Sequence, residues 1–233
     1  MLTETDSGID LWLQLRRAPG EAGRRTLIAL ADAEDLARVS LGPDAEPLVI
    51  RRAPRILFGK VPVALPPGAF LQPSAVGEAA LVRAAAVALS GRRRIADLYA
   101  GCDTFTFALS EAAVLHGVEG DPAAEAALAA AARGLGGRVT TECRDLARSP
   151  LTAGELGRFD AVLLDPPRAG ARAQVAEIAA SRLDLAVYVS CDPKSFARDA
   201  RILVDGGFSL DRVLPVDQFP WTAHLEIVGV FRR

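Results

Sequence analysis

Residues 95–121, IADLYAGCDTFTFALSEAAVLHGVEGD, contain the pattern that decides the fold. IADLYA and AVLHGVEG are short apolar runs typical of buried strands, and TFTFALSEA between them has helical spacing. The alternation continues with strands expected at GRVTTEC, FDAVLLD and DLAVYVS, each followed by a helix or a loop. Strands that alternate with helices predict a parallel sheet with helices on both faces.

The two ends of the chain depart from this alternation. FSLDRVLPV and HLEIVGVFR are two closing strands without a helix between them, so they must be antiparallel. The first 72 residues predict a strand at IDLWLQL, a helix at RRTLIALADAEDLARV and short strands at PLVIRR, RILFG and VPVAL. We therefore expect an α/β domain over 73–233, a mostly parallel sheet with an antiparallel C-terminal strand, and a small α+β segment over 1–72.

The composition excludes several classes of protein. No apolar run of about 18 residues is present, so no membrane partner is expected. The N-terminus has neither the basic start nor the apolar stretch of a secretory signal. Cys102, Cys143 and Cys191 form no CxxC pair, which argues against a disulfide framework or a metal site and favours a reducing cytoplasm. A protein that holds nucleic acid through phosphate contacts alone usually has an excess of positive charge, whereas this chain has a net charge of −2.

The first three strands of the alternation each end in a candidate ligand-binding residue. Open α/β sheets bind ligands at the carboxyl ends of their strands. Gly101 would let the backbone approach a ligand, although an ordinary turn explains it equally well. Glu119 could accept hydrogen bonds from ribose hydroxyls, whereas Asp121 fits a helix cap. Asp145 could meet an adenine edge or serve only as a cap.

The next two strands end in turns stiffened by proline. LLDPPRAG (163–170) places two prolines directly after Asp165, which fixes its carboxylate at the ligand-binding edge. VYVSCDPKSF (187–196) places Cys191 at the end of a buried strand. A cysteine there is either a packing residue or a nucleophile, and its position alone leaves both open.

From about Gly68 to Arg233 the chain resembles the S-adenosylmethionine-dependent RNA uridine-C5 methyltransferases, which make 5-methyluridine in rRNA and tRNA. Six blocks carry the resemblance in order: GAFLQPS, DLYAGCDTF, VEGD, LDPPRAG, VSCDP and DQFPWTAHLEIVGVFRR. The resemblance implies a Rossmann-like methyltransferase fold, S-adenosyl-L-methionine as cofactor and RNA as partner. Overall likeness favours 23S rRNA over tRNA.

The resemblance also assigns roles to individual residues. Cys191 matches the catalytic nucleophile and Glu226 the general base. The positions that match cofactor contacts are Gln72, Tyr99, Glu119, Asp145 and Asp165. A thiolate that adds to carbon 6 of uracil makes carbon 5 nucleophilic, and a base must later remove the carbon 5 proton. The N-terminus of the helix after Pro193, Lys194 and Arg168 are candidates for supporting the thiolate.

Three further residues near the predicted catalytic pair are expected to have secondary roles. His224 precedes Glu226 by two residues on a predicted strand, so both side chains should share a face. We expect His224 to have a structural role or to position the substrate. Phe219 and Trp221 could support a flipped-out base or pack the last strand pair. His116 is expected to be a core or edge residue.

The chain departs from the family pattern at two positions near the site and at its front. Asp103 stands where the family usually has the second glycine of a Gly-x-Gly turn, and Asp192 stands where it usually has asparagine. The first would put a charge beside the cofactor, and the second would raise the pKa of the thiol. The N-terminal RNA-binding barrel and the iron–sulfur cysteines of many members are missing, which indicates a short form or a fragment.

Three functions remain open from the sequence. The first is an RNA uridine-C5 methyltransferase, for 23S rRNA or alternatively for tRNA. The second is a catalytically degenerate methyltransferase-like RNA-binding module, which the two aspartates favour and the retained Cys191 and Glu226 oppose. The third is a small-molecule methyltransferase, which the same pair of residues opposes because most such reactions need no covalent step.

Overall fold

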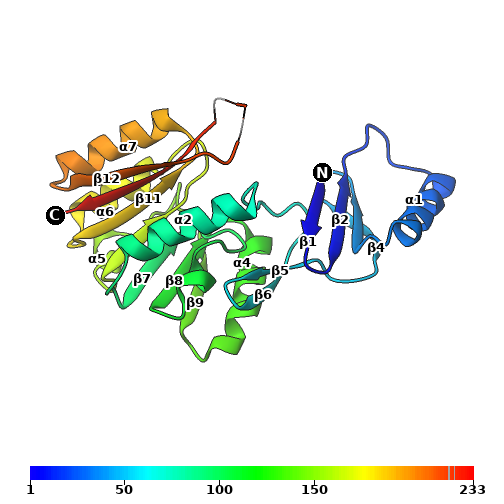
Figure 1. Cartoon of the computed structure of the whole chain (residues 1–233), viewed down its shortest axis with the longest axis horizontal. Coiled ribbons are helices and arrows are strands. Elements are labelled where there is room, and N and C mark those ends of the chain that lie inside the picture. Colours follow the sequence, from blue (N-terminus) through cyan, green and yellow to red (C-terminus); the bar gives the residue numbers. More distant parts are fainter. Residues whose placement is uncertain (220, 223) are drawn as a thin grey trace. The chain divides into compact units, whose positions relative to one another are not determined.

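The computed structural model describes residues 1–219, 221–222 and 224–233 (Figure 1). The chain forms two compact units, Met1–Phe70 and Leu71–Arg233. The division lies two residues before the boundary expected from the sequence, within the loop that precedes the first long helix of the second unit.

The first unit is a small α+β fold. Its four-stranded sheet has the order β1 (Leu2–Thr5), β2 (Gly8–Leu13), β3 (Arg38–Leu41), β4 (Glu46–Ile50), and β5 (Arg55–Phe58) pairs with β6 (Val61–Ala64). Helix α1 (Glu21–Ala33) connects the parallel strands β2 and β3. Ala31, Leu36 and Val39 form its small apolar core.

A buried ion pair reinforces this unit. Nε of Arg38 donates to Oδ1 of Asp10 at 2.9 Å, and a second nitrogen lies 2.5 Å from Oδ2. The same guanidinium donates to the carbonyl of Leu65 at 3.0 Å. Arg38 therefore ties β2, β3 and the segment after β6 together through one fixed, multiply bonded cation.

The helix expected at RRTLIALADAEDLARV was predicted too long. It ends at Ala33, and Arg38–Leu41 forms β3 instead. Asp35 adopts a positive φ of 49°, which ends the helix, and its carboxylate accepts hydrogen bonds from Arg51 and Arg52. The sequence pattern also missed β1, which pairs with β2 in an antiparallel ladder.

The second unit contains a seven-stranded sheet with the order β12-β13-β11-β10-β7-β8-β9. The strands are β7 (Arg94–Leu98), β8 (Val114–Glu119), β9 (Val139–Cys143), β10 (Ala161–Leu164), β11 (Leu185–Ser190), β12 (Ser209–Val216) and β13 (Glu226–Arg232). Strands β7 to β11 are parallel to one another, and β13 runs antiparallel to both β11 and β12. The predicted mostly parallel sheet with an antiparallel C-terminal strand is confirmed.

Helices cover both faces of this sheet (Figure 1). They are α2 (Ala75–Ala88), α3 (Thr106–Leu109), α4 (Pro122–Ala132), the short 3₁₀ helix Arg133–Leu135, α5 (Ala153–Leu156), α6 (Arg172–Ala180) and α7 (Pro193–Asp205). Leu98, Leu164 and Tyr188 point toward the face where α5, α6 and α7 pack, in one apolar cluster with Phe196 and Leu203. Alternate residues of each strand point to the other face, which α2, α3 and α4 cover.

The connection after β7 differs from the sequence prediction. TFTFALSEA was expected to be a full helix, but α3 is a single turn that ends at Leu109. Ser110 follows it and donates its hydroxyl to the carbonyl of Phe107 at 2.8 Å, which competes with continued helical bonding. The short turn leaves the loop between Tyr99 and Phe105 as the main feature above β7.

Candidate functional site

The strand order reverses between β7 and β10, and the predicted site residues gather there. The first β-α-β units extend from β7 through β8 to β9, whereas β10 and β11 continue on the other side of β7. Ligands in such sheets bind at this switch point, outside the carboxyl ends of the strands. Tyr99 directly follows β7 and Asp165 directly follows β10, and the Asp165 N–H donates to the carbonyl of Leu98 at 3.2 Å.

Glu119 ties the first turn to the end of β8. One carboxylate oxygen accepts from the N–H of Gly101 at 2.8 Å, and the other accepts from the N–H of Asp121 at 2.7 Å. Gly101 has a positive φ of 62°, and a side chain added there would meet open space within the described part of the chain. Asp121 caps α4, as expected, by accepting from two backbone N–H groups.

Tyr99 and Asp145 complete this half of the site. Tyr99 has a positive φ of 61°, and burial together with the carboxylates of Asp199, Asp145 and Glu119 raises its pKa to about 12. Asp145 is exposed, and its Oδ1 accepts from the N–H groups of Ala147 and Arg148 at 3.0 and 3.3 Å. Asp145 therefore caps the turn that follows it, which is one of its two expected roles. It lies beside the place where a ligand could bind.

A chain of buried side chains occupies the other half of the site. Nε2 of Gln218 donates to Oε1 of Gln72 at 2.8 Å, and Nε2 of Gln72 lies 3.4 Å from Oδ2 of Asp165. Burial, together with the nearby carboxyls of Glu226 and Asp97, raises the pKa of Asp165 to about 8. The shift favours the neutral form of this carboxyl relative to an exposed aspartate.

Cys191 and Glu226 lie at the same end of an antiparallel ladder. Ser190 on β11 pairs with Ile227 on β13, so one further step places Cys191 opposite Glu226. Residues that face each other in this way have neighbouring side chains. Burial, followed by the carboxyls of Glu226 and Asp165, raises the pKa of the Cys191 thiol, and Arg168 opposes the rise. Burial also raises the pKa of Glu226, which is 4% exposed.

Asp192 directly follows Cys191 and is the N-cap residue of α7. Its carboxylate caps α7 by accepting from the N–H of Ser195 at 2.8 Å. This bond lowers the pKa of Asp192. An asparagine side chain could accept the same bond, so the change from the family pattern preserves the helix cap.

The environment of Asp103 also bears on the charge that the sequence led us to expect beside the cofactor. It has a positive φ of 127° and is 3% exposed, and its Oδ2 accepts from the N–H of Phe107 at 2.7 Å. Burial and the neighbouring Asp97 raise the pKa of Asp103 well above its usual range. The raised pKa disfavours the negative charge that the sequence led us to expect beside the cofactor.

The loop before β13 contains the remaining predicted residues. The strand begins at Glu226 rather than at His224, so the expectation that both lie on one strand face was wrong. Nδ1 of His224 lies 3.5 Å from a nitrogen of Arg168, and its ring packs edge-on against Phe219. Trp221 is fully exposed, which rules out packing as its role. Pro220 and Ala223 of this block lie outside the described residues.

Sequence reasoning missed two buried polar residues of the site. Gln218 lies within a quoted block, but only its distant contact with Gln72 reveals it. Asp97 lies on β7, accepts from the hydroxyl of Thr106 at 2.7 Å, and burial raises its pKa to about 7. A carboxyl within a run of apolar strand residues was the available signal for Asp97.

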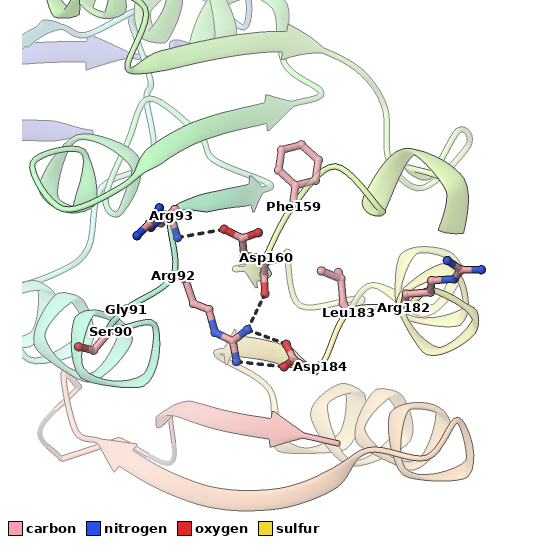
Figure 2. Close-up of a pocket in the computed structure, with 9 residues that line it drawn as sticks. All are labelled: Ser90, Gly91, Arg92, Arg93, Phe159, Asp160, Arg182, Leu183 and Asp184. Atoms are coloured by element: carbon pink, nitrogen blue, oxygen red, sulfur yellow. Dashed lines mark hydrogen bonds and ion pairs between the residues drawn. The ribbon is translucent and has the colours of Figure 1, made fainter.

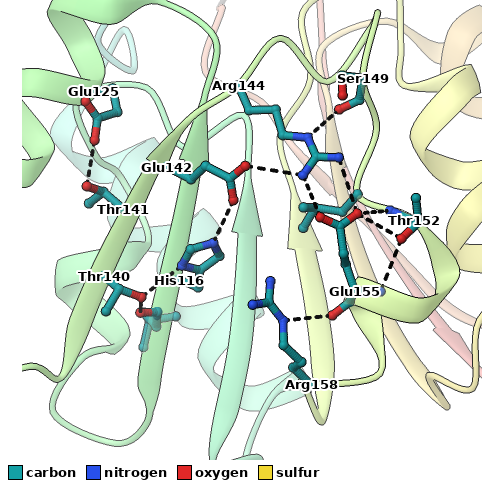
Figure 3. Close-up of polar contacts among 12 residues, drawn as sticks. His116, Glu125, Thr140, Thr141, Glu142, Arg144, Ser149, Thr152, Glu155 and Arg158 are labelled. Atoms are coloured by element: carbon teal, nitrogen blue, oxygen red, sulfur yellow. Dashed lines mark hydrogen bonds and ion pairs between the residues drawn. The ribbon is translucent and has the colours of Figure 1, made fainter.

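Two other polar features lie away from this site. A cavity of about 440 Å³ lies where β7, β10 and β11 begin, at the opposite edge of the sheet, and Arg92 crosses it to bond both carboxylate oxygens of Asp184 (Figure 2). His116 bonds Thr140 and Glu142 in a network with Arg144 (Figure 3), on β8, which lies inside the sheet next to the edge strand β9.

The described residues contain no group of three or more histidine, cysteine, aspartate or glutamate side chains placed to hold a metal ion. Within the same residues, none of the helices combines the length and apolarity needed to cross a bilayer.

The second unit has the Rossmann-like fold of methyltransferases, and its candidate site lies where that fold binds ligands. The whole chain resembles the solved tRNA (uracil-54, C5)-methyltransferase of Pyrococcus abyssi in complex with S-adenosyl-L-homocysteine, with a TM-score of 0.77 and 21% identity. The likeness covers 99% of this chain and 58% of that one. The predicted fold is thereby confirmed.

Sequence comparisons relate the chain to RNA methyltransferases. Residues 138–233 match the family model described as tRNA (Uracil-5-)-methyltransferase. The chain is 46% identical to an uncharacterized RNA methyltransferase of Caulobacter vibrioides, covering 100% of this chain and 56% of the relative. It is 40% identical to the 23S rRNA (uracil(1939)-C(5))-methyltransferase RlmD of Chromohalobacter salexigens, covering 94% of this chain and 48% of that relative. The predicted relationship to the RNA uracil-C5 methyltransferase family is confirmed, and the chain spans about half the length of these curated relatives.

Proposed function

We propose that this chain transfers a methyl group from S-adenosyl-L-methionine to carbon 5 of a uridine in RNA. The observation that carries the proposal is the placement of Cys191 opposite Glu226 at the end of the β11–β13 ladder, beside the switch point of the sheet. A thiol and a carboxyl placed to accept a proton are the two groups that a covalent C5 methylation requires, and Cys191 and the buried Glu226 supply them.

The residues around Gly101 fit the proposed cofactor. The open space beside Gly101 and the neighbouring Glu119 carboxylate suit a nucleoside whose ribose hydroxyls donate to an acid. Tyr99, Glu119 and Asp145 would hold the nucleoside, and Gln72 and Asp165 would hold the part near the reacting centre. S-adenosylmethionine supplies an electrophilic methyl group when it is bound there.

Cys191 and Glu226 would perform the steps that belong to the protein. The Cys191 thiolate forms a bond to carbon 6 of uracil, and the electron pair of the 5,6 double bond makes carbon 5 nucleophilic. After methylation, Glu226 takes the proton from carbon 5. The electrons of that C–H bond restore the double bond and expel the thiolate. Arg168 stabilises the thiolate before it adds to carbon 6 and again when it leaves.

23S rRNA is our preferred substrate because a relative with that named activity is 40% identical to the chain. tRNA is the second candidate, supported by the description of the family model and by the fold neighbour from Pyrococcus abyssi. We also propose a cytoplasmic location. We propose that residues 73–233, together with Gln72 directly before them, contain the cofactor site, while 1–72 form part of a central α+β subdomain.

A covalent trap tests the proposal. The protein is incubated with S-adenosylmethionine and 23S rRNA or tRNA fragments that contain 5-fluorouridine, with Cys191→Ala as the control. Fluorine cannot leave carbon 5 as a proton, so a working enzyme stalls as a denaturation-resistant protein–RNA adduct. An adduct that requires both Cys191 and the cofactor supports the mechanism. A chain that binds both ligands and forms no adduct would instead be a degenerate binding module.

A further inference from the structure

Three polar side chains from distant parts of the sequence form one chain of contacts at the candidate site. Gln218 precedes the closing strand β13, Gln72 precedes α2, and Asp165 follows β10. Gln72 and Gln218 are 9% and 6% exposed. The contact of 2.8 Å between the two amides therefore lies out of water, where a hydrogen bond strongly restricts the orientation of its partners.

The two amides constrain each other because each has one donating and one accepting end. Gln218 donates to the carbonyl oxygen of Gln72, which turns the amino group of Gln72 toward Asp165. One N–H of that group faces the carboxyl, and the second remains for an acceptor on a bound ligand. A Gln72 side chain without this partner could rotate its amide and present oxygen instead.

We propose that Gln218 is a positioning residue that holds the amide of Gln72 in the orientation needed to bind the cofactor. The inference rests on the proposed function, in which Gln72 and Asp165 contact S-adenosylmethionine. It makes Gln218 part of the binding machinery although it has no assigned contact with the cofactor or with RNA.

A glycine in the first turn of α2 makes room for this arrangement. A Cβ atom at Gly77 would overlap the amide of Gln218. Glycine inside a helix costs up to about 1 kcal/mol relative to alanine, so its presence at a helical position needs a packing reason. The space that it leaves for Gln218 is such a reason, and it provides a second way to disturb the amide chain.

Two variants disturb Gln218 by different routes. Gln218→Met removes the amide at similar volume, and Gly77→Ala displaces the amide while favouring the helix. Isothermal titration calorimetry with S-adenosyl-L-homocysteine is the readout because it needs neither RNA nor turnover. We expect each variant to bind about three- to tenfold more weakly, which corresponds to the loss of one hydrogen bond. Overlap with the buried Gln218 side chain offsets the gain in helix propensity, so the Tm of Gly77→Ala should lie at or below that of the wild type.

A double-variant cycle shows whether Gln218 acts through Gln72. In a Gln72→Met background, adding Gln218→Met should change the affinity by less than about twofold, because the amide that it positions is already gone. Gln174→Met is the matched control. Gln174 is a fully buried glutamine that bonds Leu151, so its loss should lower the Tm and leave the affinity unchanged.

The outcomes separate this inference from the proposed function. A wild-type protein that fails to bind S-adenosyl-L-homocysteine would overturn both. A wild-type protein that binds, with Gln218→Met and Gly77→Ala binding equally well, would overturn the positioning role alone. Additive effects of Gln72→Met and Gln218→Met would also overturn it, because Gln218 would then act independently of Gln72.

Discussion

Glu226 lies opposite Cys191 at the end of the β11–β13 ladder, and its carboxyl raises the pKa of the Cys191 thiol. The proposed base thus opposes ionisation of the proposed nucleophile. Arg168 acts in the other direction and lowers the pKa of both groups. The balance among these three side chains leads to two predictions about the thiol.

Arg168→Gln should make the thiol less reactive. Without the guanidinium, the pKa of Cys191 rises further, and each unit of increase reduces the thiolate fraction near neutral pH about tenfold. We expect alkylation of Cys191 by iodoacetamide to slow by roughly two- to tenfold at pH 7.5, measured by mass spectrometry. Arg172→Gln, an exposed change on α6, should leave the rate as in the wild type. Equal rates at all pH values for Arg168→Gln would contradict this prediction.

Glu226→Gln should separate thiol reactivity from turnover. Removing the carboxyl lowers the pKa of Cys191, so alkylation of the thiol should accelerate at pH 7.5. Methylation should fall by at least about 100-fold because the carbon 5 proton has no acceptor. A covalent adduct with ordinary uridine-containing RNA should then accumulate, visible by denaturing gel electrophoresis. Glu142→Gln, in the network at β9, should change neither quantity. Multiple turnover near the wild-type rate in Glu226→Gln would remove Glu226 from the mechanism.

The sequence predicted the strands of the second unit well because each is a buried apolar run bounded by turn residues. β11, for example, is buried along its whole length, ends at Ser190 and is soon followed by Asp192-Pro193. The antiparallel β12–β13 pair also followed from the missing crossover helix. These features depend on local residues, which a single sequence displays directly.

The incorrect predictions involve backbone conformations and distant contacts. The end of α1 depends on the positive φ of Asp35 and its contacts with Arg51 and Arg52, about 16 residues later in the chain. The role of Gln218 depends on Gln72, which is 146 residues away. Periodicity contains no information about such pairs, and Gln218 became a candidate only after the fold brought them together.

Asp103→Gly should stabilise the protein increasingly as pH rises. The pKa of Asp103 is raised in the fold, so the folded state binds more protons than the unfolded state between about pH 4 and the raised value. The stability of the wild type therefore falls as pH increases through this window. Glycine removes the buried carboxyl and suits the φ of 127°. We expect the Tm of the variant to exceed that of the wild type by several degrees at pH 8, at about 2–4 °C per kcal/mol, and by less at pH 5.

Asp103→Asn distinguishes charge from backbone strain in this prediction. Asparagine keeps an acceptor for the N–H of Phe107 and the positive φ but does not titrate. The Tm of Asp103→Asn should also depend less on pH than that of the wild type. It should lack the pH-independent rise in Tm that glycine gains when the backbone strain is relieved. A difference between Asp103→Gly and wild type that is the same at pH 5 and pH 8 would show that the carboxyl titrates normally.

The ion pair between Arg38 and Asp10 gives a prediction for the first unit. Arg38→Met leaves the Asp10 carboxylate buried without its partner, which should cost about 3–5 kcal/mol of unfolding free energy. Arg38→Met combined with Asp10→Leu leaves no unpaired charge and should recover most of that loss.

Urea titration can report on this unit through Trp12, whose indole bonds the carbonyl of Gly42, in a Trp221→Phe background. Arg51→Met removes two ion pairs, with the mostly exposed Asp32 and Asp35, and should cost no more than about 1 kcal/mol. A double variant as unstable as Arg38→Met would mean that the hydrogen bond from Arg38 to Leu65, rather than the charge pair, stabilises the unit.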